Sequence, residues 1–500
     1  MLLNVRAVAG TLAALLFFLG IALLAPAFVG LVYREPAGWS FLSTSIISLL
    51  VGGVGWIRLK RAIDQVQVRE GFAIVALAWF VLSLVGAIPF MTTGILPSLT
   101  DAFFETMSGF TTTGATVLGG PGTPDIEDLP NALLFWRSLT HWLGGMGIIV
   151  LALAVLPILG VGGMQLFRAE VPGPSADKLT PRVRETAKRL WLIYVSLTAV
   201  QTLMLATPMG LFDAINHAFS TMATGGFSTR SASVGAYDSA YVDWVVIVFM
   251  FLAGTSFALH YRLFMERRAG VLLATEFRVY LAISVVAAIL VTIGIWDWTA
   301  QRVALQDPTA GSLAVTAEAV RLATFQVLAI VTTTGFATAD YAVWSPLAVG
   351  IIFLLFFSGG MAGSTAGGVK VMRHVLMFKN SFKEIKQLVH PQAVLPVRLD
   401  DTVVSQDVLR NVLSFLVLYI GLVGFGTGIM ALIGMDLLSA FGSTMSAVGN
   451  IGPAFGTTGP AENYAHIAPA GKWVLALLMM AGRLEIFTVL ILFVPAYWRR

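Results

Sequence analysis

The stretch Ser108-Gly-Phe-Thr-Thr-Thr-Gly-Ala115 decides the fold, because it follows a short amphipathic segment between two long apolar runs and recurs in altered form. The later versions are Thr221-Met-Ala-Thr-Gly-Gly-Phe-Ser228, Ile330-Val-Thr-Thr-Thr-Gly-Phe-Ala337 and Val448-Gly-Asn-Ile-Gly-Pro-Ala454. One glycine of each tract aligns, with steps of 112, 109 and 117 residues, at Gly114, Gly226, Gly335 and Gly452. A period this regular, with apolar runs on both sides of every tract, indicates an internal fourfold repeat.

The composition places the chain among membrane proteins. Of its 500 residues, 57% are apolar and 12% charged, whereas soluble domains are usually about 45–50% apolar and roughly 25% charged. The net charge of +4 gives no indication of a nucleic-acid partner. The chain has no cysteine, which excludes disulfides, thiolate catalysis and cysteine-ligated metals.

Ten apolar runs are long enough to cross a bilayer, which takes about 20 residues. They cover 8–32, 40–58, 71–93, 133–158, 190–209, 242–265, 277–297, 344–361, 408–433 and 471–495. The first run contains Ala25-Pro26-Ala27, a weak match to a signal-peptide cleavage site. Since it exceeds the ~7–15 residues of a signal core, we expect a retained helix.

The loops alternate in basic charge. Lys and Arg gather in 58–70, 165–190, 262–278 and 370–410, while the loops between them hold few and the stretch 92–134 holds none. Positive loops face the cytoplasm, so we expect both termini on the cytoplasmic side of a bacterial-type inner membrane.

The repeated tracts have the chemistry of a cation pathway. Backbone carbonyls of a tight loop can replace the water shell of an ion, and such a loop needs glycine because few other residues reach the backbone angles. The short helix before each tract would direct its negative C-terminal end at the ion, and none of the tracts contains an acidic residue. Glycine and threonine can also serve helix packing alone, but four equivalent tracts favour a pore.

Two further features lie near this pathway. Span 344–361 runs into the glycine-rich segment 357–371, which should break the helix and could obstruct the path. That segment resembles a phosphate-binding loop, but Val369 separates Gly368 from Lys370 and no strand precedes it, so we reject a nucleotide site. Arg483 lies within the last span, where a charge costs about 2.5–3.5 kcal/mol, which predicts either a gate post or a salt bridge, for instance with Glu485.

Several segments resemble the TrkH branch of the Trk/Ktr/HKT potassium transporter superfamily. Besides the first tract they are Arg69-Glu-Gly-Phe72, Asp101-Ala-Phe-Phe-Glu105, Trp136-Arg-Ser-Leu139, Trp142-Leu-Gly-Gly-Met-Gly-Ile-Ile149, Gly160-Val-Gly-Gly-Met-Gln165 and Arg168-Ala-Glu170. The resemblance covers nearly the whole chain. It implies an all-α polytopic membrane protein with four helix–pore-helix–helix repeats around a pseudo-fourfold pore, plus two N-terminal helices.

The implied organisation is a two-helix extension over 1–65, then pore repeats over 66–165, 166–270, 271–395 and 396–500, with an intramembrane loop at 359–370 in the third. The resemblance also implies K⁺ as the transported ion with no other cofactor, a homodimer, and a cytoplasmic nucleotide-binding regulatory subunit like TrkA. The basic loops 165–190 and 370–400 would be its docking surfaces.

The site residues fall into two groups. We expect the filter at Thr112, Thr113, Gly114, Thr224, Gly225, Gly226, Thr333, Thr334, Gly335, Asn450, Ile451 and Gly452, with Gly449 an alternative to Gly452 in the fourth tract. We expect the gate at Gly359, Gly360, Gly363, Ser364, Thr365, Gly367, Gly368 and Arg483. Asp101, Glu105 and Asp213 near the outer mouth would cap short helices or attract cations weakly.

Other classes fit less well. A secondary transporter of another cation, Na⁺-coupled or Na⁺-selective, remains the alternative, although inverted or two-part repeats would be expected for one. An intramembrane enzyme lacks its motifs, since there is no His-Glu-x-x-His and the six histidines are scattered. A structural scaffold would not explain four tracts.

Overall fold

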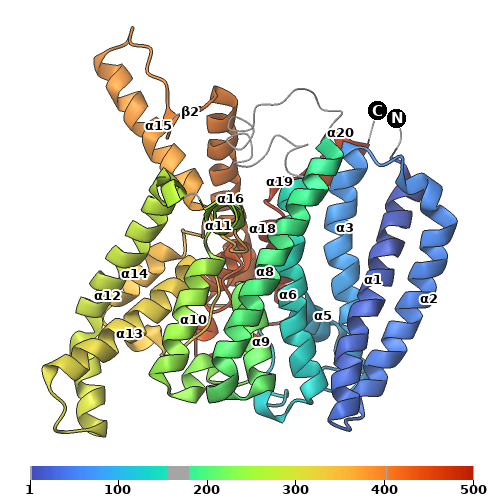
Figure 1. The fold of residues 1–500 in the computed structure, drawn as a ribbon, viewed down its shortest axis with the longest axis horizontal. Helices are drawn as coiled ribbons and strands as arrows, with labels where there is room; N and C mark the ends of the chain where they lie inside the picture. Colours follow the sequence, from blue (N-terminus) through green and yellow to red (C-terminus); the bar gives the residue numbers. More distant parts are fainter. Residues whose placement is uncertain (1–2, 155–178, 268, 401, 499–500) are drawn as a thin grey trace.

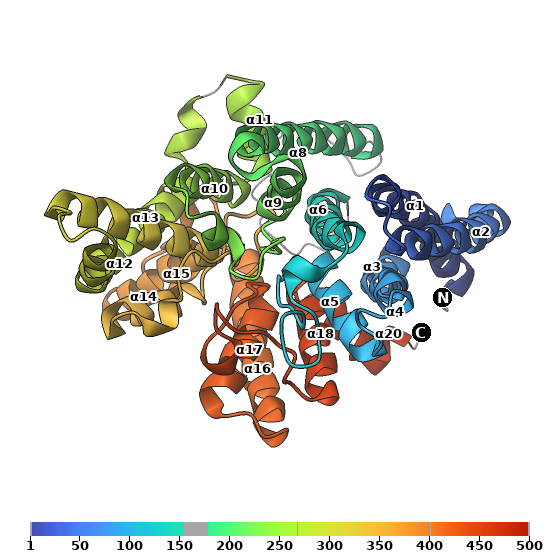
Figure 2. The same cartoon turned by 90° about the horizontal axis from the view of Figure 1, so that it is seen from below.

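The computed structural model describes residues 3–154, 179–267, 269–400 and 402–498, and these are almost entirely helical. Two long helices, α1 (Val5–Val32) and α2 (Ala37–Ile63), form a hairpin at one edge of the molecule (Figures 1 and 2). They pack closely through glycine, because a Cβ at Gly52 would lie 2.5 Å from the backbone nitrogen of Phe17. Small residues play this part between membrane helices, where apolar burial alone gives little association.

The rest of the chain repeats one pattern of three helices, in which the middle helix ends at a glycine tract. The four units are α3 (Val68–Gly86) with α4 (Ile88–Thr92), α5 (Leu99–Phe110) and α6 (Asn131–Ala154); α8 (Leu179–Met209), α9 (Leu211–Met222) and α10 (Ala240–Ala253); α12 (Thr275–Gln306), α13 (Ser312–Val331) and α14 (Pro346–Leu355); and α16 (Gln406–Leu432), α17 (Leu437–Gly449) and α18 (Pro469–Arg483). In the third unit the middle helix, α13, is longer than the α14 that follows it. The middle helices α5, α9, α13 and α17 approach a common centre from different sides (Figure 2).

Smaller elements complete the described chain. They are α11 (Phe257–Phe264), α15 (Val371–Val389), the antiparallel pair β1 (Arg398–Leu399) and β2 (Thr402–Val403), α19 (Phe487–Leu490) and α20 (Pro495–Trp498), with single turns of 3₁₀ helix between them. Helix α15 projects away from the body together with the β1–β2 hairpin (Figure 1).

The membrane spans differ in part from the ten expected runs. Within the described residues, seven helices are long and apolar enough to cross a membrane, or nine if each bent pair counts as one span. The predicted spans 242–265 and 471–495 are not straight, because their helices bend by 98° after Ala253 and by 115° after Arg483. The predicted span 344–361 is helical only over α14, and the end of 133–158 lies outside the described residues.

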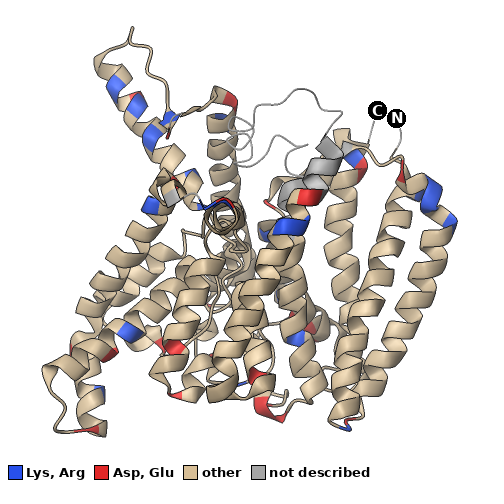
Figure 3. Cartoon of the chain, viewed as in Figure 1, with Lys and Arg blue, Asp and Glu red and all other residues tan. Residues whose placement is uncertain are grey.

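Charge follows the topology that the loops indicate. Lys and Arg concentrate at the end of the helices where both chain termini lie, whereas acidic residues are frequent at the opposite end (Figure 3). The predicted all-α, multi-pass membrane fold is confirmed.

Candidate functional site

The four middle helices end in the same way, and this end places the glycine tracts. In each unit one residue takes the left-handed conformation, with φ of 51° at Thr112, 54° at Thr224, 55° at Thr333 and 53° at Asn450. The N–H of the next residue bonds the carbonyl five positions back, as from Thr113 to Ser108 at 2.9 Å and from Ile451 to Ser446 at 3.0 Å. This is the Schellman end of a helix, in which the left-handed residue is usually glycine.

The fourth tract differs from the other three in the type of residue that takes the left-handed conformation. Threonine is β-branched, so a left-handed Thr112, Thr224 or Thr333 costs about 1–3 kcal/mol of backbone strain. Asparagine enters this conformation more readily, and the Asn450 side chain also donates to Thr113 Oγ1 at 3.0 Å and to Met479 O at 2.9 Å. The divergent fourth tract therefore reaches the same backbone geometry with a different residue.

The aligned glycines close a ring. All four have positive φ, 81° at Gly114, 82° at Gly226, 77° at Gly335 and 99° at Gly452. A Cβ on each would lie 2.0–2.6 Å from the carbonyl oxygen of the middle tract residue of the next unit, which no real contact allows. The pairs run in cyclic order: Gly114 to Gly225, Gly226 to Thr334, Gly335 to Ile451, and Gly452 back to Thr113. Gly452, and not Gly449, completes the ring, since Gly449 is the last residue of α17.

The tract carbonyls are almost free of protein donors. Among the twelve expected filter residues, all of them described, hydrogen bonds reach only the carbonyl of Gly452, from Ser446 Oγ at 2.8 Å and Tyr464 Oη at 2.7 Å. The threonines, Asn450 and Ile451 of the tracts are buried. Buried carbonyls are normally paired with protein or water, so a ring of unpaired ones is suited to hold a desolvated cation.

The glycine-rich loop after α14 lies against the inner ends of these tracts. Gly367 donates its N–H to Thr333 Oγ1 at 2.6 Å, and a Cβ on Gly367 would meet Gly449 O at 2.4 Å. The hydroxyl of Thr365 donates to Met222 O at 3.0 Å and to Ala253 O at 3.2 Å. The loop thus contacts the second, third and fourth units directly below the ring.

Backbone bonds fix the rest of the loop. Met361 donates to Gly254 O at 2.8 Å, Val371 donates to Gly360 O at 3.1 Å, and Gly363 O accepts from Phe257 at 3.1 Å. A Cβ on Gly359 or Gly368 would fall 2.5–2.7 Å from a carbonyl of the loop itself, and Ser364 Oγ bonds Met361 O at 2.6 Å. Sequence reasoning missed one anchor, the buried Glu276 of α12, which accepts the N–H of Ala362 at 2.7 Å.

Arg483 joins the loop to the first unit. Its side chain is buried, and it donates to Thr365 O at 2.7 Å and to Gly144 O of α6 at 3.3 Å. The suggested salt bridge between Arg483 and Glu485 is not formed, because Glu485 pairs with Arg373 of α15. The reason is the bend after Arg483, where Glu485 and Ile486 have φ of 62° and 57° and turn away from the α18 axis.

The three acidic residues expected near the outer mouth are ion-paired, which the sequence did not reveal. Asp101 contacts Lys472 at 2.5 Å, Asp213 contacts Arg230 at 3.1 Å, and the fully buried Glu105 contacts Arg137 at 2.9 Å. Asp101 and Asp213 also lie in the first turns of α5 and α9, as expected of carboxylates at helix ends, but each of the three carboxylates already has a basic partner. Among the described residues, no three His, Asp or Glu side chains are grouped to hold a metal ion.

Comparison with known proteins agrees with this geometry. The model of the TrkH family, described as a cation transport protein, matches residues 37–500. The chain is 42% identical to the Trk system potassium uptake protein TrkH of Salmonella typhimurium, over 99% of this chain and 100% of that protein. The chain belongs to the TrkH family.

Other members extend the match. The TrkG protein of Escherichia coli is 35% identical over 99% of both chains, and the TrkH of Halomonas elongata is 38% identical over 100% of both. The crystal structure of the potassium transporter TrkH from Vibrio parahaemolyticus has a TM-score of 0.86 at 38% identity, covering 99% of each chain. As a TrkH-family member, the chain is a membrane transport protein and not an enzyme.

Proposed function

We propose that this chain takes up potassium ions across the bacterial inner membrane, through a filter made by the carbonyls of its four glycine tracts. Relatives of 34–42% identity are named as potassium uptake proteins of the Trk system. The ion would leave its water shell at the ring formed by Gly114, Gly226, Gly335 and Gly452.

One observation carries this proposal: a ring of backbone carbonyls in the buried tracts, of which only that of Gly452 accepts hydrogen bonds from the described residues. The four middle helices end at the ring, so their negative C-terminal ends favour a cation there and oppose an anion. The ring contains no carboxylate, which suits a weakly held ion that must also leave.

The loop 359–370 and Arg483 form the proposed gate. They cross directly below the ring and are held by bonds to all four units. A buried guanidinium in the path also repels cations, so release of Arg483 from Thr365 O would remove both a steric and an electrostatic barrier.

The remaining parts of the proposal concern orientation and partners. Both termini would be cytoplasmic, because the basic loops lie at their end of the helices. A TrkA-like nucleotide-binding subunit would bind on that side, with α15 and the β1–β2 hairpin as one surface, and the chain would form a homodimer. Of the other expected surface, 165–190, residues 165–178 lie outside the described residues.

The test is rubidium uptake into cells that lack their own potassium uptake systems. The parent chain is compared with Gly335→Ser and Arg483→Ala, under competition by K⁺ or Na⁺ and with a matched regulatory subunit supplied. We expect K⁺ to compete and Na⁺ not, Gly335→Ser to weaken that preference, and Arg483→Ala to change the flux.

Two results would overturn the proposal. Uptake at background despite correct insertion would show that the chain moves another substrate. If Na⁺ competes as well as K⁺ in the parent, a Na⁺-selective or Na⁺-coupled transporter is the correct function.

A further inference from the structure

A second ring of hydrogen bonds lies just beyond the glycine ring. In every unit the carbonyl two residues after the ring glycine accepts a bond from the preceding unit. The donors and acceptors are Tyr464 N to Thr116 O at 2.8 Å, Arg137 Nη1 to Ser228 O at 3.0 Å, Gly235 N to Ala337 O at 3.0 Å, and Tyr341 Oη to Ala454 O at 2.7 Å. The order is cyclic, from the fourth unit to the first, the first to the second, and onward.

We call these four bonds the collar. Its acceptors are equivalent by the repeat, but its donors are two backbone N–H groups, a guanidinium and a phenol hydroxyl. Four unrelated donors that reach four equivalent carbonyls indicate that the bond itself, and not a particular residue, is needed at this level. The collar joins the four units on the outer side of the ring, as the glycine contacts join them at the ring itself.

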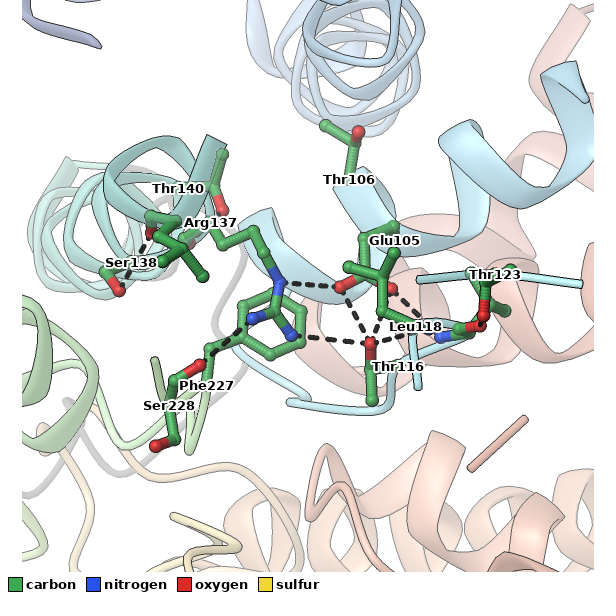
Figure 4. A network of polar contacts seen from close by, with 12 residues as sticks. Glu105, Thr106, Thr116, Leu118, Thr123, Arg137, Ser138, Thr140, Phe227 and Ser228 are labelled. Atoms are coloured by element: carbon green, nitrogen blue, oxygen red, sulfur yellow. Dashed lines mark hydrogen bonds and ion pairs between the residues drawn. The ribbon is translucent and has the colours of Figure 1, made fainter. Parts of the chain in front are cut away.

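The Arg137 member is built into a buried network (Figure 4). Arg137 Nε contacts Glu105 of α5 at 2.9 Å, Nη2 donates to Thr116 Oγ1 at 3.3 Å, and the guanidinium carbon lies 4.2 Å from the centre of the Phe227 ring. Glu105 in turn accepts from Thr116 Oγ1 and from Val117 N, both at 3.0 Å. One arginine therefore fixes the segments that follow both Gly114 and Gly226.

The Tyr341 member is simpler. Its side chain is fully buried, its hydroxyl donates to Ala454 O, and its ring packs edge-on against Phe455 at 5.7 Å between centres. Removal of the hydroxyl leaves the ring contact in place but abolishes the only collar bond between the third and fourth units. Tyr341→Phe is therefore the cleanest change available.

We propose that the collar sets the diameter of the filter ring, so that Arg137 and Tyr341 are positioning residues that determine ion selectivity. The inference rests on the proposed potassium filter. A ring of carbonyls distinguishes cations by the spacing and number of oxygens it presents, and that spacing holds only if the segments on both sides of each glycine are fixed. The inner side is fixed by the helix ends, and the collar fixes the outer side.

The experiment measures K⁺/Na⁺ selectivity in rubidium uptake, expressed as the Na⁺ inhibition constant divided by the K⁺ inhibition constant, together with the amount of inserted protein. Tyr341→Phe should lower this ratio about fivefold, the equivalent of one net hydrogen bond, with maximal uptake near that of the parent. The matched control is Tyr280→Phe: Tyr280 is equally buried and donates to Phe251 O at 3.2 Å, but it lies outside the collar. It should leave the ratio unchanged.

The role of Arg137 is tested with variants that either keep or remove the charge of its partner Glu105. Arg137→Gln alone leaves Glu105 buried and unpaired, so it should lower the amount of inserted protein. The double variant Arg137→Gln with Glu105→Gln removes both charges; we expect it to restore the protein level and not the K⁺/Na⁺ ratio. If Arg137 and Glu105 served only to stabilise the fold, the double variant would restore both the protein level and the K⁺/Na⁺ ratio.

The outcomes separate the two proposals. If Tyr341→Phe and the double variant keep the parental ratio while Gly335→Ser lowers it, the filter stands and the collar proposal is wrong. If Gly335→Ser also keeps the parental ratio, the filter is misplaced and both proposals fall. A lowered ratio in Tyr341→Phe and in the double variant, with Tyr280→Phe unchanged, supports the collar.

Discussion

Two stretches of non-helical, glycine-rich backbone meet at the centre of this molecule and differ in how their polar groups are used. In the filter tracts the carbonyls are left without protein donors, except at Gly452. In the loop 359–370 the polar groups are bonded to Thr333, Glu276, Gly254, Arg483 and Met222. In the proposed pathway the tract oxygens would hold the ion, whereas the bonds of the loop would have to break before an ion could pass.

The largest expected effect comes from filling the ring. Gly226→Ala forces a left-handed alanine and places its Cβ 2.0 Å from Thr334 O, so the tracts of the second and third units must separate. Rubidium uptake should fall at least about tenfold, since such strain and displacement together exceed one conformational penalty of ~1–3 kcal/mol.

The control for this change is Gly350→Ala. Gly350 lies in α14 with nothing within 4 Å of the added Cβ and without a positive φ, so uptake should stay parental. Equal losses in the two variants, at equal protein levels, would contradict the special place of Gly226.

The next effect comes from opening the loop. Arg483→Gln removes the bond to Thr365 O and the buried positive charge, and hydrogen bonds from charged groups contribute about 1.5–3 kcal/mol. Uptake without a stimulating partner should therefore rise about tenfold, while the K⁺/Na⁺ ratio stays parental. Arg483→Lys keeps the positive charge but loses the guanidinium, which donates through two nitrogens. Its uptake should lie between that of the parent and that of Arg483→Gln. A fall in the selectivity ratio would show that Arg483 acts on the filter and not on the gate.

A smaller effect on basal uptake should distinguish Thr333 from Thr112, which occupy equivalent positions in the third and first tracts. Thr333→Val removes the acceptor of Gly367 N, so basal uptake should rise about fivefold, as expected for one hydrogen bond. Thr112→Val is the matched control, because Thr112 has the same left-handed backbone and a buried hydroxyl without a hydrogen-bond partner. If both variants change uptake alike, the link between filter and loop does not contribute.

The smallest effect is expected far from both regions. Glu127 accepts the N–H of Ser231 at 2.7 Å and its hydroxyl at 2.5 Å, which joins the outer loops of the first two units. Partial burial opposes its ionisation, but the Ser231 bonds prevail and lower the pKa of Glu127. The stabilisation is thus present above the ordinary value of about 4.3 and is lost as pH falls through the lower folded pKa.

Glu127→Gln should leave uptake and selectivity within about 1.5-fold, as surface contacts contribute little. Hydrogen exchange at the Ser231 amide should be faster in the variant than in the parent at pH 7, with the difference vanishing at acid pH. A pH-independent difference would mean that the carboxylate charge is not responsible.

Much of the architecture was readable from the sequence because the repeat carries it. The period of the glycine tracts predicted the repeated units and three of the ring glycines and left Gly449 as an alternative to Gly452, and the glycine-rich run after 357 predicted the break in the eighth span. The bends after Ala253 and Arg483 were hidden, because an apolar window reads the same whether the helix continues or turns. The collar could not be predicted from the sequence. Its four donors occupy equivalent positions in space, but they are different chemical groups and form no common motif.

The cyclic contacts between the units also bear on how the protein is made. The ring is completed by Asn450 and Gly452 against Thr113, across 337 residues of chain. At a synthesis rate of about 5–20 residues per second, the first tract waits roughly 20–70 s for its last neighbour. During that interval a ribosome-bound chain holds only part of the ring, so the proposed filter would become complete only after the fourth unit has inserted.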